Sequence, residues 1–232
     1  LLGGGPVILG PHILTEGARA VELSGSTACV AFYNHASKLG GIQLLDLSDP
    51  SNPTEMGRFE TGDSGIGVRG RGSLAYIAFL NPYTFLGGVH VVDVSDPEDP
   101  IRVGTFDTLY DPQSLALDGD HAFAADGAYG VVIIDLIDPA HPTQAAALDT
   151  DGFARDIAVA SGRAFVADGE AGLLVLEIDT SREEGAGIVR VADANPRVAR
   201  LQAAPFVPGA GERRSYLNTR AGVAVAPLAV EP

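Results

Sequence analysis

Five short apolar runs recur along this chain of 232 residues, and a glycine precedes each of them. The five glycines are Gly41, Gly88, Gly130, Gly172 and Gly222, so the runs are spaced 42 to 50 residues apart. A unit of this length cannot bury its own apolar face and must stack on its neighbours. The repeat therefore restricts the chain to architectures that are built from tandem units.

The first three runs end in similar turns at residues 46–50, 93–97 and 135–139, each of which ends in Asp-Pro. We expect the aspartate of each Asp-Pro pair to accept a backbone N–H two residues farther on, while the proline fixes φ at the next position. A second proline follows three residues later and starts an outer strand, where a missing N–H is tolerated. The aspartates are Asp49, Asp96 and Asp138, and the second prolines are Pro53, Pro100 and Pro142.

Each unit is predicted to hold four short strands. In the fourth unit, residues 154–160 alternate in polarity, and the strands at 164–168 and 173–177 follow after glycine turns. Residues 54–60 of the first unit supply the fourth strand after the proline turn. The third strand is apolar at almost every position, which is typical of a strand that is covered on both faces.

Four-stranded sheets repeated at this period favour a β-propeller. The last unit stops after its third strand, while residues 6–14 resemble an unpaired fourth strand. We therefore predict an all-β, five-bladed β-propeller of four-stranded antiparallel blades, with the ring closed by the N-terminal strand completing the last blade. The single domain spans 1–232, with blades at 18–60, 66–107, 113–149, 154–203 and 206–232 plus 6–14. The alternative is that the chain is a fragment of a larger ring.

The strand pattern resembles the LVIVD repeat, a bacterial and archaeal propeller repeat. The resemblance rests on residues 154–159, 164–168 and 172–177, and its most specific part is the turn at 46–53. It extends over residues 15–180, and residues 181–194 are interpreted as an insertion between the third and fourth strands of the fourth unit. The resemblance implies a propeller, often secreted or surface-associated. It implies no reaction, so no catalytic role is transferred to any residue.

The charge balance limits the kinds of partner. The chain has 30 acidic and 15 basic residues, for a net charge of −15. Such a chain is a poor binder of polyanions, so we expect neither nucleic acid nor an anionic membrane as a partner. No apolar stretch is long enough for a transmembrane helix. Because the chain starts at Leu1, we expect that any targeting peptide has been removed, and we predict an extracytoplasmic or secreted monomer.

One face of a propeller carries the loops between second and third strands together with the links between blades, and function usually collects on such loops. The loops at 33–41 and 80–88 are longer than their counterparts at 127–130 and 169–172. Acids, arginines, a histidine and aromatic residues that converge there predict a ligand-binding site at the channel mouth. The predicted site residues are Arg19, His35, Asp63, Tyr83, Tyr110, Asp111, Asp151 and Arg155.

Two functions fit this face. The first is a non-catalytic binding or scaffold propeller that presents its loops to a protein, a glycan or a small ligand. The alternative is a hydrolase or lyase for a carbohydrate-like substrate, with His35 or Tyr83 as acid–base group and Arg19 or Arg155 holding an anion. No cofactor is expected, although a Ca²⁺ ion on Asp63, Asp111 and Asp151 is conceivable. Asp126 and Asp168 share one repeat position and are predicted to anchor turns.

Overall fold

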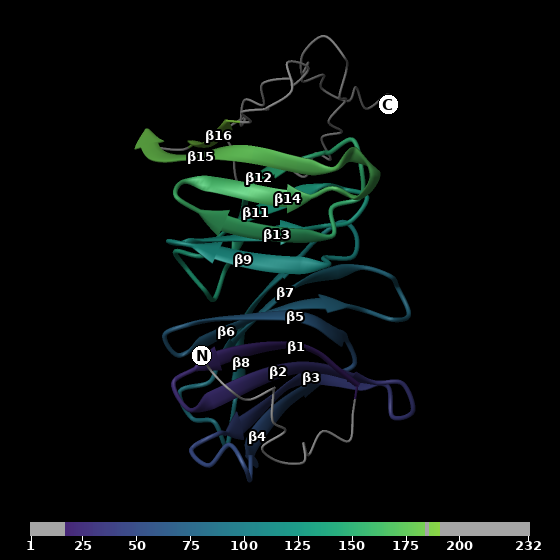
Figure 1. Ribbon diagram of the computed structural model, residues 1–232, viewed down its shortest axis with the longest axis vertical. Helices are drawn as coiled ribbons and strands as arrows, with labels where there is room; N and C mark the ends of the chain where they lie inside the picture. The colour runs from purple at the N-terminus through teal and green to yellow at the C-terminus, as the bar shows by residue number, and fades with distance from the viewer. Residues whose placement is uncertain (1–16, 184–185, 191–232) are drawn as a thin grey trace, which may run out of the picture.

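The computed structural model describes residues 17–183 and 186–190, which form four antiparallel four-stranded sheets. Each sheet keeps its strands in chain order or in the exact reverse of it, as expected for a meander. Figure 1 shows the sheets following one another along the long axis of the molecule, from the first sheet in purple to the fourth in green. This all-β arrangement is consistent with successive blades of a propeller. The predicted closing strand at 6–14 and the fifth blade at 206–232 lie outside the described residues.

The sheets have the following strands. The first contains β1 (Gly17–Ser24), β2 (Thr27–Asn34), β3 (Leu39–Asp46) and β4 (Thr54–Thr61). The second contains β5 (Ser64–Arg71), β6 (Leu74–Leu80), β7 (Gly87–Asp93) and β8 (Ile101–Asp107). The third contains β9 (Ser114–Asp118), β10 (His121–Ala125), β11 (Val131–Asp135) and β12 (Thr143–Leu148). The fourth contains β13 (Asp156–Ala160), β14 (Arg163–Ala167), β15 (Leu173–Glu183) and β16 (Ala186–Arg190).

Neighbouring sheets pack through their first strands, with β1 against β5, β5 against β9, and β9 against β13. Three apolar clusters fill the spaces between successive sheets. Ile42 and Val68 lie in the first of these clusters, Leu115 and Ile134 in the second, and Leu176 in the third. Burial of these side chains supplies the main stabilising free energy, because apolar area removed from water contributes about 25 cal/mol per Å².

The third strands are covered on both faces, as their sequence predicts. In β7, every residue from Gly87 to Val92 is buried, and β11 is buried from Val131 to Ile134. Each Asp-Pro turn also has the predicted cap. Asp49 accepts a hydrogen bond from the backbone N–H of Ser51 at 3.0 Å. Asp96 and Asp138 accept equivalent bonds from Glu98 and Ala140, also at 3.0 Å.

The fourth strand of one sheet packs tightly on the Asp-Pro turn of the next sheet. A Cβ atom built on Gly57 of β4 would lie 2.1 Å from the backbone oxygen of Pro97. Gly104 of β8 has the same relationship with Pro139, also at 2.1 Å. The equivalent position in the third sheet holds Ala146. The sheet that follows it, the fourth, has no Asp-Pro turn to approach this position. Glycine is thus needed where a turn of the next sheet approaches.

The expected insertion at 181–194 is wrong for the described part of that segment. β15 continues to Glu183, and β16 pairs with it antiparallel from Ala186 to Arg190. The fourth strand of the fourth sheet therefore lies inside the segment that was interpreted as an insertion. Within the described residues, no helix is long and apolar enough to cross a membrane.

Candidate functional site

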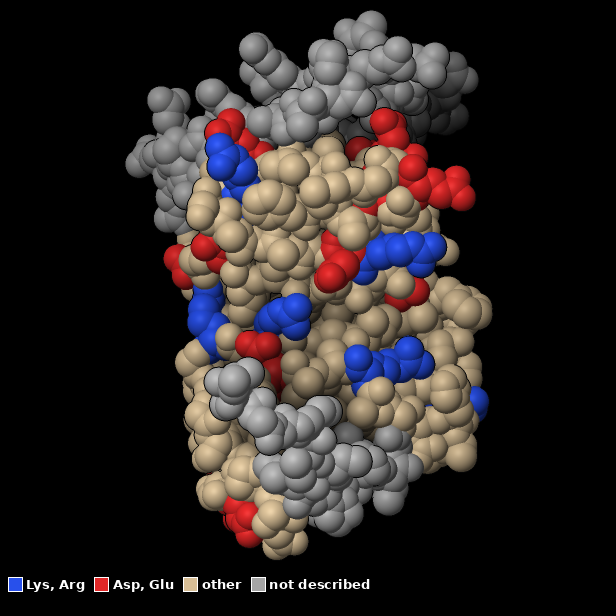
Figure 2. Space-filling model, viewed as in Figure 1, with Lys and Arg blue, Asp and Glu red and all other residues tan. Residues whose placement is uncertain are grey.

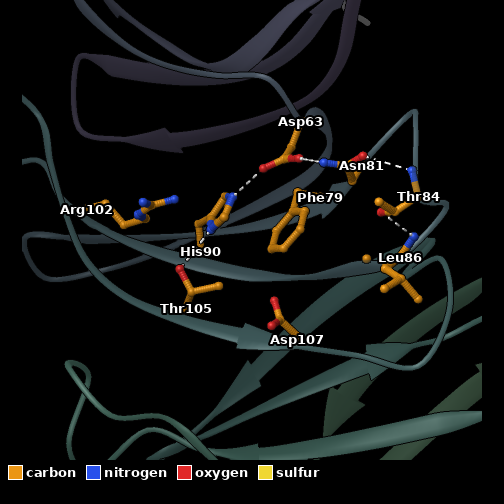
Figure 3. A pocket seen from close by; sticks show the side chains of 10 residues that line it. Asp63, Phe79, Asn81, Thr84, Leu86, His90, Arg102, Thr105 and Asp107 are labelled. Atoms are coloured by element: carbon orange, nitrogen blue, oxygen red, sulfur yellow. Dashed lines mark hydrogen bonds and ion pairs between the residues drawn. The ribbon is translucent and has the colours of Figure 1, made fainter.

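A cavity of about 430 Å³ lies on the second sheet, below the loop that joins β6 to β7. The loop contributes Asn81, Thr84 and Leu86, and the strands β7 and β8 contribute the floor. Figure 3 shows His90 near the centre, between the link residue Asp63 and Thr105 of β8. The remaining lining residues are Phe79, Gly87, Arg102 and Asp107.

His90 is held on both sides of its ring by hydrogen bonds. Its Nε2 lies 3.2 Å from Oδ2 of Asp63, and its Nδ1 lies 3.1 Å from Oγ1 of Thr105. Its ring stacks on Phe79 with a centroid separation of 3.8 Å. Burial lowers the pKa of His90, and the neighbouring Asp63 carboxylate only partly opposes this shift. The imidazole is therefore neutral at pH 7, and it can donate one hydrogen bond and accept the other.

Asp63 can bond to His90 because the second sheet has an asparagine where the third and fourth sheets have an aspartate. In the third and fourth sheets, the residue after the second strand is an aspartate, Asp126 or Asp168. Asp168 accepts hydrogen bonds from the Thr150 hydroxyl at 2.6 Å and the Gly152 N–H at 3.0 Å, so its predicted role as an anchor is confirmed. In the second sheet this position is Asn81, whose amide donates to Asp63 at 2.9 Å. In the second sheet the carboxylate therefore belongs to Asp63 in the link, and its other oxygen faces the imidazole of His90.

Asp126 anchors its link less completely. It is fully buried and faces the Thr108 hydroxyl and the backbone N–H groups of Leu109 and Tyr110. Neither carboxylate oxygen has a partner with good hydrogen-bond geometry. Burial, with a smaller contribution from the neighbouring Asp111, raises its pKa to about 6, although hydrogen bonding to Thr108 and to the backbone of the link partly opposes the shift. This aspartate therefore binds a proton more readily than an exposed carboxyl does.

The loop between β6 and β7 is locked by its first residue. The Asn81 side-chain oxygen accepts the N–H groups of Tyr83 and Thr84, both at 3.0 Å. Its backbone oxygen accepts the Phe85 N–H at 2.9 Å, and its own N–H donates to Leu86 at 2.8 Å. Phe85 has φ = 59°, a conformation that non-glycine residues rarely adopt. The lock nevertheless leaves Tyr83 and Phe85 69% and 67% exposed.

A second aromatic group lies beside this loop. The Tyr110 ring is 5.8 Å from the Tyr129 ring and 6.3 Å from the Phe153 ring. The Arg155 guanidinium lies 5.1 Å above the centre of Phe153. Thr108, two residues before Tyr110, donates its N–H to the backbone oxygen of Gly87 at the start of β7. The link 108–111 therefore connects the exposed loop to this aromatic group.

Comparison with known proteins identifies the repeat. The model of the LVIVD repeat matches residues 17–61, 68–108, 111–150 and 151–181, one segment for each sheet. The chain belongs to the LVIVD repeat family. The first and third LVIVD segments contain all four strands of their sheets, the second begins within β5, and the fourth ends within β15.

Among solved structures, the chain is similar to the computationally designed Ika4 protein, with a TM-score of 0.56 and 9% sequence identity. The similarity covers 74% of this chain and 98% of the designed chain. At this identity the likeness concerns the fold alone. No curated protein sequence matches the chain significantly.

The predicted site residues fall into separate groups on the LVIVD repeats. Asp63 lines the cavity, while Tyr110 and Arg155 belong to the aromatic group around Phe153. Burial raises the pKa of Asp111, and the charge of Arg19 partly opposes this shift, so these two residues are electrostatic neighbours. They do not form one site with the cavity residues.

The other predicted residues lie farther out. His35 is exposed and packs edge-on against Tyr33 at 4.8 Å, and Tyr83 projects from its loop. Asp151 is exposed, and in the described part of the chain no group of three acidic, histidine or cysteine side chains could hold a metal ion. The conceivable Ca²⁺ site on Asp63, Asp111 and Asp151 therefore does not form.

The sequence interpretation missed His90, Arg102, Thr105 and Asp107. The sequence does not single out His90, because it lies among valines in a strand that is otherwise apolar. One signal could have identified it, since the equivalent position holds Gln43 in the first repeat and Val132 in the third. A buried polar residue at such a position needs a hydrogen-bond partner, and the partners of His90 are Asp63 and Thr105, which line the cavity.

Proposed function

We propose that this protein is a non-catalytic binding module that docks a protein partner on its loop face. The docking surface consists of six exposed side chains, here called the aromatic ridge. They are Tyr83, Phe85, Leu86, Leu109, Tyr110 and Tyr129, with exposed fractions between 37% and 70%. Exposed aromatic and apolar side chains that lie together on one surface are typical of protein interfaces.

The main support is the locked loop. Asn81 forms four hydrogen bonds that fix residues 81–86, so Tyr83 and Phe85 are presented without a large loss of conformational entropy on binding. A non-glycine residue at positive φ costs about 1 kcal/mol or more, and such strain is concentrated at functional sites. The equivalent loop of the first sheet has the same Asn34 lock, with Lys38 in place of Phe85. The exposed tyrosine and phenylalanine are therefore a feature of the second-repeat loop that the first-repeat loop does not share.

The charges around the ridge favour a basic partner. Asp107 and Asp111 flank Leu109 and Tyr110 in the link, and the chain as a whole has a net charge of −15. On the face drawn in Figure 2, acidic and basic side chains are interspersed among uncharged residues, so the excess of acid is not gathered there. Carboxylates beside aromatic rings suit a segment that combines Arg or Lys with apolar side chains.

The alternative of a hydrolase or lyase has less support. It assigned acid–base work to His35 or Tyr83, and both are exposed and outside the cavity. Arg155 packs on Phe153 and Arg19 lies near the Tyr33 ring at 6.0 Å, so the two arginines are not directed at one bound anion. A binding module needs none of these groups to be catalytic. The extracytoplasmic location and the monomeric state stay predictions.

We also propose that residues 206–232 and 6–14 complete a fifth blade. The support is that the first and fourth sheets expose apolar side chains, Val21 at 57%, Leu23 at 64% and Leu173 at 68%. A further blade between these sheets would cover such residues and leave no open edge. Deletion of residues 1–14 should then lower the melting temperature by several degrees. An unchanged melting temperature would contradict closure.

Selection from a random peptide library on the immobilised protein tests the docking proposal. We expect enriched peptides that combine basic and aromatic residues, and we expect their recovery to fall on the double variant Tyr83→Ser/Phe85→Gly. The matched control is Ile137→Ser, because Ile137 is 50% exposed but lies in an Asp-Pro turn at the opposite end of its sheet. Enrichment that is equal on the double variant, or no enrichment at all, would contradict docking on the ridge.

A further inference from the structure

The outer strands β4 and β8 are equivalent in the repeat, but one face of each strand carries different side chains. Arg58 of β4 lies opposite Gln43, and Thr105 of β8 lies opposite His90. Both strands have a bulge, which places Glu55 opposite Leu45 and Arg102 opposite Val92. A bulge changes the face to which the preceding side chains point. It therefore brings Arg102 to the same face as Thr105 and Asp107.

In the first sheet this face is closed by its own charges. Arg58 bonds to Glu55 at 2.7 Å through Nε and at 2.8 Å through Nη2, and to Glu60 at 3.2 Å through Nη1. Arg58 lowers the pKa of Glu55, as a direct ion pair should. Gln43 adds a hydrogen bond to Glu55. The guanidinium thus fills the space between two carboxylates.

In the second sheet the same space is open. Thr105 replaces the long arginine, while Arg102 and Asp107 replace the two flanking glutamates. Neither Arg102 nor Asp107 forms an ion pair with another residue of the described chain. Both side chains line the cavity of about 430 Å³, with Thr105 between them in β8 (Figure 3). One cation and one anion therefore face the same empty space.

We propose that this cavity binds a small zwitterion of the amino-acid class. Arg102 would pair with the ligand carboxylate, because its planar guanidinium group can donate two parallel hydrogen bonds to a carboxylate. Asp107 would hold the ammonium group, and the Thr105 hydroxyl would add a contact between them. Four register steps separate Arg102 from Asp107, which corresponds to about 13 Å of strand. An extended arginine side chain covers much of this distance, so a ligand whose two charges lie close together can reach both Arg102 and Asp107.

The surroundings agree with this charge pattern. His90 is neutral at pH 7 because burial lowers its pKa, so Arg102 is the only cation among the residues that line the cavity. Asp63 has one oxygen bonded to Asn81 and the other beside His90, so among the described residues Asp107 is the carboxylate of this cavity that has no ion-pair partner. The volume lies within the range of small-molecule sites. Leu86 lines the cavity and also belongs to the aromatic ridge, but the two charged groups that would hold the ligand, Arg102 and Asp107, are not members of the ridge.

Isothermal titration calorimetry of the full chain with each of the common L-amino acids tests the proposal. At least one amino acid should bind, and its N-acetyl derivative and its amide should bind about tenfold more weakly or worse, because each lacks one charge. Arg102→Gln and Asp107→Asn should each weaken binding by about tenfold or more. Arg163→Gln and Asp151→Asn, which change exposed charges outside the cavity, should leave it unchanged.

Three results would overturn the proposal. The first is that no amino acid binds, and the second is that glucose, a neutral polyol, binds more tightly than any amino acid. The third is that the Arg102→Gln variant, folded by its circular dichroism spectrum, binds as tightly as the parent. The peptide selection on the ridge should be unaffected by Arg102→Gln, because Arg102 takes no part in the docking surface, so the two proposals can fail separately.

Discussion

Thr105 of β8 occupies the position that Arg58 occupies in β4, each opposite the polar residue of its third strand. The exchange removes a guanidinium from between two charged neighbours and leaves a cavity in its place. A single substitution should reverse it. Thr105→Arg should restore an internal ion pair, now with Asp107, and should close the cavity.

Thr105→Arg gains an exposed ion pair of about 0.2–1 kcal/mol. It also removes the hydroxyl that lies 3.1 Å from Nδ1 of the buried His90, a loss of about 1–3 kcal/mol, so the variant should be slightly less stable than the parent. Amino-acid binding should be lost at the same time. Thermal denaturation and calorimetry on one preparation check both expectations. Thr105→Ser, which keeps the hydroxyl and the space, is the control and should bind like the parent. Binding that survives in Thr105→Arg would show that the ligand lies elsewhere.

Phe85→Gly tests the strain in the ridge loop. Glycine adopts φ near +59° without steric cost, whereas phenylalanine does not, so the variant should be more stable by about 0.5–1 kcal/mol. Chemical denaturation measures this change. Partner binding should weaken although stability rises, because the ring is 67% exposed and buries little in the free protein. A less stable variant would mean that the ring contributes to the fold.

Asp126→Asn tests the buried carboxyl. The folded-state pKa is about 6, above the usual value of 3.8, so the folded protein keeps a proton that the unfolded chain has released. Stability from this group is therefore lost as the pH rises from about 4 to about 6, and the loss stays constant at higher pH. The asparagine variant should be more stable than the parent by about 1–2 kcal/mol at pH 8. The two proteins should be nearly equal near pH 4.

Urea denaturation of parent and variant at several pH values measures this difference. Asp118→Asn is a suitable control, because it removes one exposed carboxyl at the end of β9 without changing the buried site. A parent that is more stable than Asp126→Asn at pH 8 would indicate that the carboxylate is ionised and well bonded in the folded state.

Gly104→Ala tests the packing of one sheet on the next. The new Cβ would meet the Pro139 oxygen at 2.1 Å, and a backbone oxygen cannot move without shifting the turn. We expect a loss of about 1–3 kcal/mol in the free energy of unfolding, the usual cost of overpacking. Gly62→Ala is the matched control, since no atom lies within 4 Å of its Cβ position. Equal melting temperatures for the two variants would contradict the close approach.

Much of the fold follows from local sequence rules. The strand periodicity and the Asp-Pro turns depend on contacts within about ten residues, and the third strands can be recognised from their own continuous apolar sequence. For that reason the positions of Asp49, Asp96 and Asp138 as caps could be predicted and are confirmed. The last unit of the described chain was harder, because β15 and β16 lack the proline turn that marks the start of the fourth strand elsewhere.

The candidate site was predictable only in part. Asp63 was expected on the loop face, but its partner His90 is 27 residues away and belongs to an apolar strand. The pairing depends on the exchange of an aspartate for Asn81 at one repeat position, and on a bulge that turns Arg102 toward the cavity. Both are departures from the repeat. A pattern that averages over the units does not reveal them.

The central claim is that the ridge loop binds a partner that the rest of the surface does not bind. Its most direct test is the dissociation constant of the best selected peptide, measured by fluorescence polarisation for the parent, for Tyr83→Ser/Phe85→Gly and for Ile137→Ser. We predict that the double variant binds about tenfold more weakly or worse, while Ile137→Ser binds like the parent. Equal affinities for all three proteins would contradict the claim.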